Sequence, residues 1–235
     1  MTREIAVEAT PLDYDVEPDR FRTGSECSRK YGPGDVHEAV AKRIAGEQLS
    51  PVLDLGCGEG RLCRLLEDRG IPVVGVDNSP TMLSAVSSSR VLGDASDLPF
   101  RDAWFGAVAA LYMLYHVPNP LTALNESCRV LRAGGLFVAV TPSRDNDPEL
   151  ADILPQGPSP FDAEDAPDMV RSVFTRVEVE SWAAPLVHLP TEDALSEYLF
   201  GRGIPRAECG KAAKRVGAPI DITKRGCLIW GYKDA

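Results

Sequence analysis

The stretch that decides the fold runs from Pro51 to Leu62 and reads PVLDLGCGEGRL. A short apolar run ends near an acid, and three glycines follow at alternate positions, Gly56, Gly58 and Gly60. Glycine weakens both strands and helices, so glycines at the point where a strand passes into a helix need a compensating role. The usual compensation is a ligand that must come close to the backbone. The alternative is a tight strand–helix turn that binds nothing.

The composition is that of an ordinary globular protein, with 235 residues of which 44% are hydrophobic and 26% charged. We expect one domain, at most with a small cap, because the sequence shows neither an internal repeat nor a second core. The net charge of −10 disfavours nucleic acid as a partner, since an acidic surface repels a polyanion. No apolar stretch is long enough to span a membrane, and residues 1–20 lack the apolar core of a secretory signal.

Six cysteines and three histidines are scattered along the chain. No two cysteines have the CxxC spacing, and no local cluster has the spacing of metal ligands. We therefore expect reduced thiols, a cytoplasmic location and no metal site.

Short β-branched runs alternate with longer helical stretches along the chain. The predicted strands are Val52–Leu55, Val73–Asp77, Val91–Gly93, Ala107–Leu111, Leu136–Thr141, Arg176–Ser181 and Gly226–Tyr232. This alternation predicts a doubly wound α/β fold, in which a seven-stranded, mostly parallel sheet is covered by helices on both faces. No clear helix leads directly into the final strand, so we expect this last strand to be antiparallel.

Capping residues place the helices between these strands. Asp35 is a predicted N-cap, and Asn119 stands before a proline at the start of another helix, which Gly134 and Gly135 should end. The glycine-rich turn should lead into a helix over Arg61–Arg69. One or two further helices are expected between the last two strands.

Ligands of doubly wound sheets bind at the carboxyl ends of the strands. Gly58 and Gly60 suit a turn that exposes backbone N–H groups to a ligand. A dinucleotide fingerprint requires a further glycine where the chain has Arg61. Asp77, at the end of the second strand, can accept both hydroxyls of a ribose or simply cap the next helix. Asp94, at the end of the third, can meet an adenine edge or act as a turn residue.

Four motifs in order carry a family resemblance. VLDLGCGEGRL, VVGVDNSPTML, GDASDLPF and RVLRAGGLFVAVTPSR together resemble the class I S-adenosylmethionine-dependent methyltransferases, in particular the small-molecule branch with the ubiquinone and menaquinone biosynthesis enzymes. The resemblance covers roughly Val36–Arg144. It implies one Rossmann-like methyltransferase domain over residues 1–235, with a cofactor-binding core at 36–144 and acceptor-site cap and lid segments at 1–35, 141–170 and 183–217. The implied cofactor is S-adenosyl-L-methionine, with S-adenosyl-L-homocysteine as product.

The resemblance assigns one group of residues to the methionine end of the cofactor. Asp54 would orient this end, directly or through water. Gly56, Cys57 and Gly58 would offer backbone against it. The backbone of Leu111, at the end of the fourth strand, would approach the amino-acid portion.

A second group is assigned to the nucleoside by the same resemblance. Asp77 would hold the ribose hydroxyls, with Asn78 beside the adenine. Asp94 would accept from the adenine amino group, and the Ala95 N–H would meet a ring nitrogen. Tyr31 matches an upstream aromatic residue that closes over the methionine moiety.

Candidate bases for the methyl acceptor follow the fourth strand. His116 is the first candidate, since an unperturbed imidazole titrates at about pH 6.5, and Tyr115 is the second. Both can equally be wall residues of the acceptor pocket. We interpret His37 and His188 as ordinary helix or surface residues, and Trp104 as a core residue.

The acceptor pocket should come from segments in which the family varies. These are Phe21–Pro33, Tyr112–Val117, Thr141–Pro167 and Glu192–Gly203. The stretch Thr141–Pro167 is rich in proline and acid and too long for a routine connection, which is typical of a lid or a flexible segment.

The leading hypothesis is an enzyme that moves a methyl group to O, N or C of a small metabolite, in natural-product biosynthesis for example. It would act as a monomer or homodimer, without membrane or nucleic acid. The alternative is a non-catalytic subunit that binds S-adenosylmethionine for a regulatory or structural purpose.

Overall fold

The computed structural model describes residues 14–154 and 157–234. The expectation about a secretory signal falls largely on residues 1–13, which lie outside the described residues. The chain divides into two compact units. The first, which we call the helical unit, comprises Met1–Gly34, Asp145–Gly157 and Ala183–Arg225. The second, the sheet unit, comprises Asp35–Arg144, Pro158–Trp182 and Gly226–Ala235.

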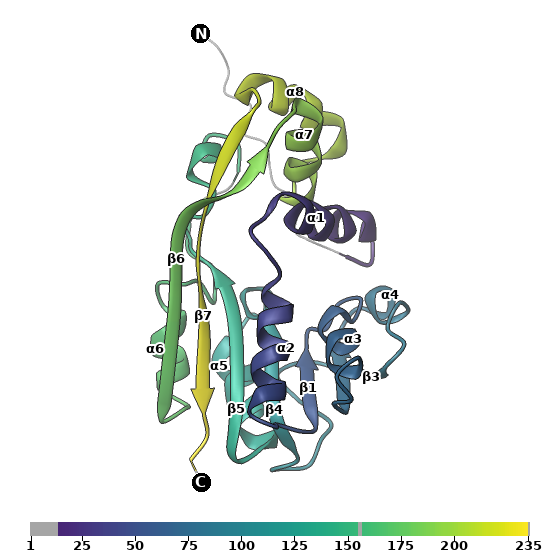
Figure 1. Ribbon diagram of the computed structural model, residues 1–235, viewed down its shortest axis with the longest axis vertical. Coiled ribbons are helices and arrows are strands. Elements are labelled where there is room, and N and C mark those ends of the chain that lie inside the picture. Colours follow the sequence, from purple (N-terminus) through teal and green to yellow (C-terminus); the bar gives the residue numbers. More distant parts are fainter. Residues whose placement is uncertain (1–13, 155–156, 235) are drawn as a thin grey trace. The chain divides into compact units, whose positions relative to one another are not determined.

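A seven-stranded sheet follows the order β3-β2-β1-β4-β5-β7-β6 (Figure 1). The strands are β1 (Val52–Leu55), β2 (Val73–Asp77), β3 (Ser89–Leu92), β4 (Phe105–Leu111), β5 (Leu131–Pro142), β6 (Arg176–Leu189) and β7 (Ile220–Tyr232). Strands β1 to β5 pair in parallel, and β7 is antiparallel to β5 and β6. The predicted fold class and the antiparallel last strand are therefore confirmed. β7 lies inside the sheet, and β6 forms the edge.

The predicted end of one helix is wrong. α5 (Pro120–Val130) passes directly into β5 at Leu131. Gly134 and Gly135 lie inside that strand, where the pairing of β5 with β4 shifts register. Gly134 has a left-handed φ of 69°, and a Cβ on Gly135 would lie 2.8 Å from the carbonyl oxygen of Arg132. These glycines thus form a bulge in a strand.

Helices cover both faces of the sheet in the sheet unit (Figure 1). α2 (Val36–Gly46), α3 (Arg61–Glu67) and α4 (Pro80–Leu83) pack on one face. α5 (Pro120–Val130) and α6 (Ala166–Arg171) pack on the other. α3 stops short of the predicted end at residue 69.

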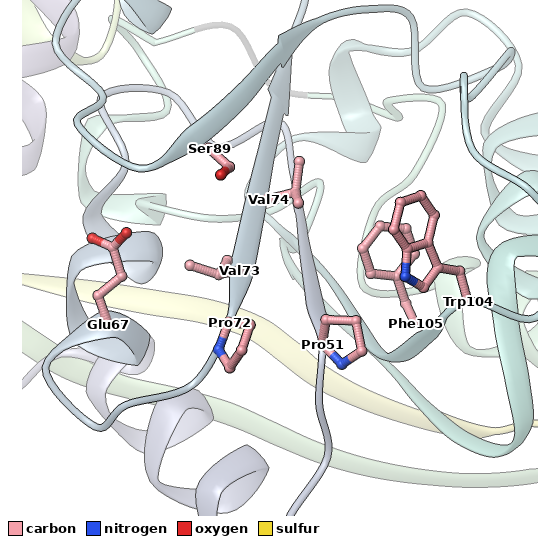
Figure 2. Close-up of a pocket in the computed structure, with 8 residues that line it drawn as sticks. All are labelled: Pro51, Glu67, Pro72, Val73, Val74, Ser89, Trp104 and Phe105. Atoms are coloured by element: carbon pink, nitrogen blue, oxygen red, sulfur yellow. The ribbon is translucent and has the colours of Figure 1, made fainter.

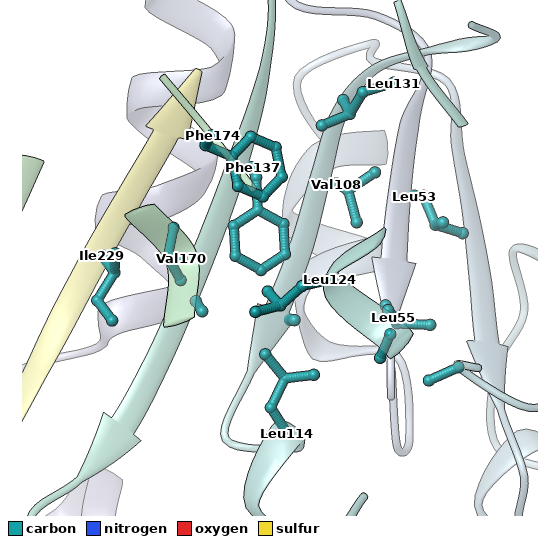
Figure 3. Packing of buried hydrophobic residues seen from close by; sticks show 14 of the residues in the cluster. Leu53, Leu55, Val108, Leu114, Leu124, Leu131, Phe137, Val170, Phe174 and Ile229 are labelled. Carbon is teal, nitrogen blue, oxygen red and sulfur yellow. The ribbon is translucent and has the colours of Figure 1, made fainter. Parts of the chain in front are cut away.

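Side chains of the central strands alternate between two hydrophobic cores, as the pleat of a strand requires. In β4, Val108 and Ala110 face the core shared with α5 and α6, whereas Ala109 faces the core shared with α2 and α3. Figure 3 shows the first of these cores, in which the rings of Phe137 and Phe174 stack with centroids 5.0 Å apart. The sheet is therefore packed against hydrophobic side chains on both faces.

The helical unit has a hydrophobic core of its own, so the expectation of no second core is wrong. Its helices are α1 (Pro18–Tyr31), α7 (Glu192–Gly201), α8 (Arg206–Val216) and the short 3₁₀ helix η2 (Pro148–Leu150). The buried residues of this core are Cys27, Leu150, Leu154, Val187, Leu189, Ala194, Leu195, Tyr198, Leu199, Phe200, Ile204, Cys209, Ala213 and Ile222. Two helices between the last two strands agree with the prediction.

The predicted lid segment Thr141–Pro167 is divided between the two units. Residues 158–167 belong to the sheet unit, where Phe161 is fully buried and the Asp162 carboxylate pairs with Arg144 at 2.8 Å. Arg144 also pairs with Asp165 at 2.6 Å. This half of the segment is anchored to the sheet unit by packing and charge.

Helices α1 and α7 approach each other through two glycines. A Cβ on Gly201 would lie 2.6 Å from the Cα of Gly24, which is closer than real contacts allow. We expect Gly201→Ala to lower the free energy of unfolding by about 1–3 kcal/mol, because the added methyl group collides with backbone. Chemical denaturation checks this. The control is Gly210→Ala in α8, where nothing lies within 4 Å, and which should be neutral or stabilising. Equal stability of both variants would contradict the close approach.

Candidate functional site

The carboxyl ends of β1, β2 and β4 bring the predicted cofactor residues of the sheet unit to one edge. β1 lies between β2 and β4, and its Asp54 is in register with Gly75 of β2 and Ala109 of β4. Asp77 and Leu111 end these two neighbouring strands. Parallel strands therefore place Asp54, Asp77 and the backbone of Leu111 on the same side of the sheet.

The glycine-rich turn after β1 has a left-handed backbone. The φ angles of Gly56, Gly58 and Gly60 are 67°, 52° and 75°. A Cβ on Gly56 would also lie 2.6 Å from the Cβ of Met113, which follows β4. Glycine is therefore required here by the backbone itself and by the close approach of a neighbouring loop.

The N–H groups of this turn have partners inside the protein. Those of Gly56 and Cys57 donate to the carbonyl oxygen of Val76, at 2.8 and 3.0 Å. That of Gly58 donates to Oδ2 of Asp77 at 2.8 Å. The expectation of N–H groups exposed to a ligand is therefore wrong for Gly58, and also for Gly60, whose N–H donates to the carbonyl oxygen of Cys57 at 2.9 Å.

Asp54 is a buried acid, with 3% of its surface exposed. Burial raises the pKa of Asp54 to about 6, although the Cys63 thiol opposes the shift by donating to its Oδ2 at 3.2 Å. A buried carboxyl group with a raised pKa gains most from a cationic ligand, and such groups mark functional sites.

Asp77 ties the turn to the end of β2. Besides accepting from Gly58, it accepts through Oδ1 from the N–H of Ser79 at 2.9 Å. The Ser79 hydroxyl itself caps α4 by accepting from Met82. Asp77 is therefore not needed as the helix cap, and an ionised carboxylate has about four acceptor positions, enough for two further hydroxyl groups.

Asp94 is an exposed turn residue after β3. Its Oδ1 accepts from the backbone N–H and the hydroxyl of Ser96, at 2.8 and 2.6 Å, and these bonds lower its pKa. Both bonds use the same oxygen atom. The roles of Asp94, Asn78 and Ala95 toward adenine stay predictions.

The loop after β4 leads into the 3₁₀ helix η1 (Leu114–His116). The rings of Tyr115 and His116 have centroids 4.4 Å apart. Desolvation lowers the pKa of His116, and the charge of Asp77 opposes this shift. The lowered pKa favours the neutral imidazole, which is the form that can accept a proton. Whether either ring meets an acceptor stays a prediction, as does the role of Tyr31 at the end of α1 in the helical unit.

A charged cluster at the start of α2 was missed by sequence reasoning. Asp35 accepts through Oδ1 from the backbone N–H of His37, and its Oδ1 lies 3.1 Å from the ring Nδ1. Its Oδ2 accepts from the Arg61 guanidinium. Burial opposes ionisation of Asp35, but the bonds from His37 and Arg61 outweigh it and lower the pKa of the carboxyl group. The ring of His37 lies 6.5 Å from that of Tyr112, between centroids, at the end of β4.

The structure also corrects the interpretation of Trp104, which is 42% exposed. It lines a surface hollow of about 340 Å³ with Pro51, Pro72 and Phe105 (Figure 2). These residues lie where β1, β2 and β4 begin. The hollow is therefore at the opposite end of the strands from Asp54 and is no part of the candidate site.

Two further properties concern the described part of the chain. Within residues 14–154 and 157–234, no group of three or more histidine, cysteine, aspartate or glutamate side chains is arranged to hold a metal ion. None of the helices described there has the length and apolar character needed to cross a bilayer.

Comparisons with known proteins identify the family. The family model for the methyltransferase domain matches residues 53–139. A demethylmenaquinone methyltransferase of Clavibacter sepedonicus is 30% identical over 175 residues, which cover 70% of this chain and 68% of the relative. The chain belongs to the S-adenosylmethionine-dependent methyltransferases.

Other relatives of this methyltransferase match a shorter part. An uncharacterised methyltransferase of Mycobacterium tuberculosis is 38% identical over 99 residues, and the match covers 40% of each chain. The present chain thus spans less than half of that relative. Among solved structures, the [4+2]-cyclase SpnF has a TM-score of 0.63 at 19% identity, with 94% of both chains covered, which shows a shared fold.

The residues of the site fit the cofactor of the family. S-adenosylmethionine carries positive charge on its sulfonium and its ammonium group, and Asp54 is a buried acid with a raised pKa at the edge where ligands of this fold bind. Asp77 has acceptor capacity for a ribose. The glycine turn provides a surface that a side chain would obstruct.

The charge of Asp54 should be unfavourable for folding and favourable for binding. A pKa raised from 3.8 to about 6 on folding corresponds to about 3 kcal/mol in the free energy of unfolding. This contribution to stability is fully present below pH 4 and is lost as the pH rises through 6. We expect Asp54→Asn to raise the melting temperature at pH 7, with the difference vanishing toward pH 4, and to abolish binding of S-adenosylhomocysteine. Thermal unfolding and calorimetry measure the two effects. Asp68→Asn, at an exposed position, is the control. A variant that binds normally would contradict the assignment.

Proposed function

We propose that this protein transfers a methyl group from S-adenosylmethionine to a small-molecule acceptor. The observation that carries the proposal is the bond from Gly58 to Asp77, which joins the glycine turn to an acid at the end of β2 beside the buried Asp54. Membership of the methyltransferase family supports it.

The cofactor would supply a methyl group on a sulfonium, which a nucleophile takes by in-line displacement. The task of the protein is then to hold donor and acceptor in line and away from water. Such positioning can supply roughly 7–11 kcal/mol of barrier reduction. Asp54 would hold the ammonium group and Asp77 the ribose. Asp94 and Ala95 would meet the adenine, with Asn78 beside it.

His116 and Tyr115 are the proposed contacts on the acceptor side. A base is needed only where the acceptor loses a proton early, as a weakly acidic hydroxyl group does. The lowered pKa of His116 favours the neutral imidazole, the form that can act as a base. With an acceptor that needs no base, the same ring serves as a wall of the pocket.

The acceptor is proposed to be a small metabolite methylated at O, N or C, in natural-product biosynthesis for example. The net charge of −10 argues against nucleic acid. The relative from Clavibacter sepedonicus is named for demethylmenaquinone, a small molecule. The proposed location is the cytoplasm, where thiols stay reduced, and all six cysteines are unpaired. The proposed oligomeric state is a monomer or homodimer.

The competing function is a subunit that binds the cofactor without transferring methyl. Tight binding of S-adenosylmethionine with no methylated product from any acceptor pool would favour it.

Titration calorimetry tests the proposal at its first step. We expect S-adenosylmethionine and S-adenosylhomocysteine to bind and NAD not to bind. Asp77→Ala should weaken S-adenosylhomocysteine about 10- to 100-fold, because it removes a ribose acceptor and leaves the N–H of Gly58 without its partner. The fold should persist, and Asp68→Ala, at an exposed position, should change nothing. Unchanged affinity of the Asp77 variant would refute the ribose assignment, and binding of NAD alone would refute the proposed cofactor.

A further inference from the structure

The carboxyl edge of the sheet unit presents an electrostatic problem to the proposed cofactor. Asp54, Asp77 and the more distant Asp94 are acids placed at the ends of successive strands. They favour the ammonium and sulfonium groups of S-adenosylmethionine. The amino-acid end of the cofactor also carries a carboxylate, which the same acids repel. A cation beside the glycine turn would offset that repulsion.

Arg61 is a cation in that place. It is the first residue of α3, directly after Gly60, the last glycine of the turn. Its side chain is 35% exposed, so it is accessible to a ligand. A guanidinium has five N–H donors, and the Nη2 group is the one that donates to Asp35. The other donors can form the paired bonds with a carboxylate for which arginine is suited.

Asp35 and His37 hold Arg61 from α2. The Asp35 carboxylate accepts from Arg61 through one oxygen and from the backbone and ring of His37 through the other. Its lowered pKa keeps it ionised, so the pair persists over the whole working range of pH. An arginine restrained in this way loses less side-chain entropy on binding a ligand.

The cluster lies beside the methionine end of the predicted site. The ring of His37 lies 6.5 Å, between centroids, from the ring of Tyr112, which directly follows β4. Arg61, which donates to Asp35, begins α3 directly after the glycine turn that follows β1. The cluster therefore faces the ends of β1 and β4, where the resemblance places the amino-acid portion of the cofactor.

We propose that Arg61 binds the carboxylate at the amino-acid end of the cofactor, and that Asp35 and His37 are positioning residues for its guanidinium. This inference rests on the proposed function. It gives a reason for arginine at the position where a dinucleotide fingerprint has glycine.

The affinities for two nucleosides distinguish binding of the carboxylate by Arg61 from a purely structural role of this residue. S-adenosylhomocysteine has the amino-acid end, and 5′-methylthioadenosine has the same adenine, ribose and sulfur without it. We expect Arg61→Gln to weaken S-adenosylhomocysteine at least 10-fold in calorimetry and to leave 5′-methylthioadenosine unchanged. Arg61→Lys should retain part of the affinity for S-adenosylhomocysteine that Arg61→Gln loses. Asp35→Asn should weaken S-adenosylhomocysteine by a smaller factor and should also leave 5′-methylthioadenosine unchanged.

The matched control is Arg64→Gln on the same helix. Its guanidinium donates to the carbonyl oxygen of Glu59, and the variant should bind both nucleosides as the wild type does. Equal weakening of both nucleosides by Arg61→Gln would show a structural role and overturn the inference, as would no weakening of either. Failure of the wild type to bind S-adenosylhomocysteine would instead overturn the proposed function.

Discussion

The hydrogen bond from the Gly58 N–H to the Asp77 carboxylate is the interaction on which the rest of the site depends. It ties a turn of left-handed glycines to the end of the neighbouring strand, while Val76 holds Gly56 and Cys57 in the same way. The turn is thereby fixed before any ligand arrives. Asp54 and Arg61 stand on either side of this turn, so its geometry sets the distance between the acid and the cation that we assign to the amino-acid end of the cofactor.

The sheet and the positions of Asp54 and Asp77 near the strand ends could be predicted because their signals are local. The bounds of β1 and β2 agree with the structure, since each is an apolar run that ends at a turn. The Asp35 cap of α2 was likewise predicted from adjacent residues. The role of Gly134 and Gly135 could not be predicted, because a glycine pair has the same local appearance in a strand bulge as at a helix end.

Features that depend on residues distant in sequence could not be predicted. In the helical unit, α1 packs on α7 through Gly24 and Gly201. The hydrophobic periodicity of the sequence does not predict that contact. The pair Asp35–Arg61 joins residues 26 positions apart, so the local sequence shows Arg61 only as a departure from the dinucleotide fingerprint. The fold alone does not determine the reaction, since a [4+2]-cyclase shares it.

The central claim is that the buried charge of Asp54 is compensated by the ammonium group of the cofactor. The most direct measurement is the pKa of the Asp54 carboxyl group by carbon-13 NMR, in the free protein and in the protein saturated with S-adenosylhomocysteine. The account predicts a pKa of about 6 in the free protein and a clear fall on saturation. A pKa that is the same in both states would contradict it.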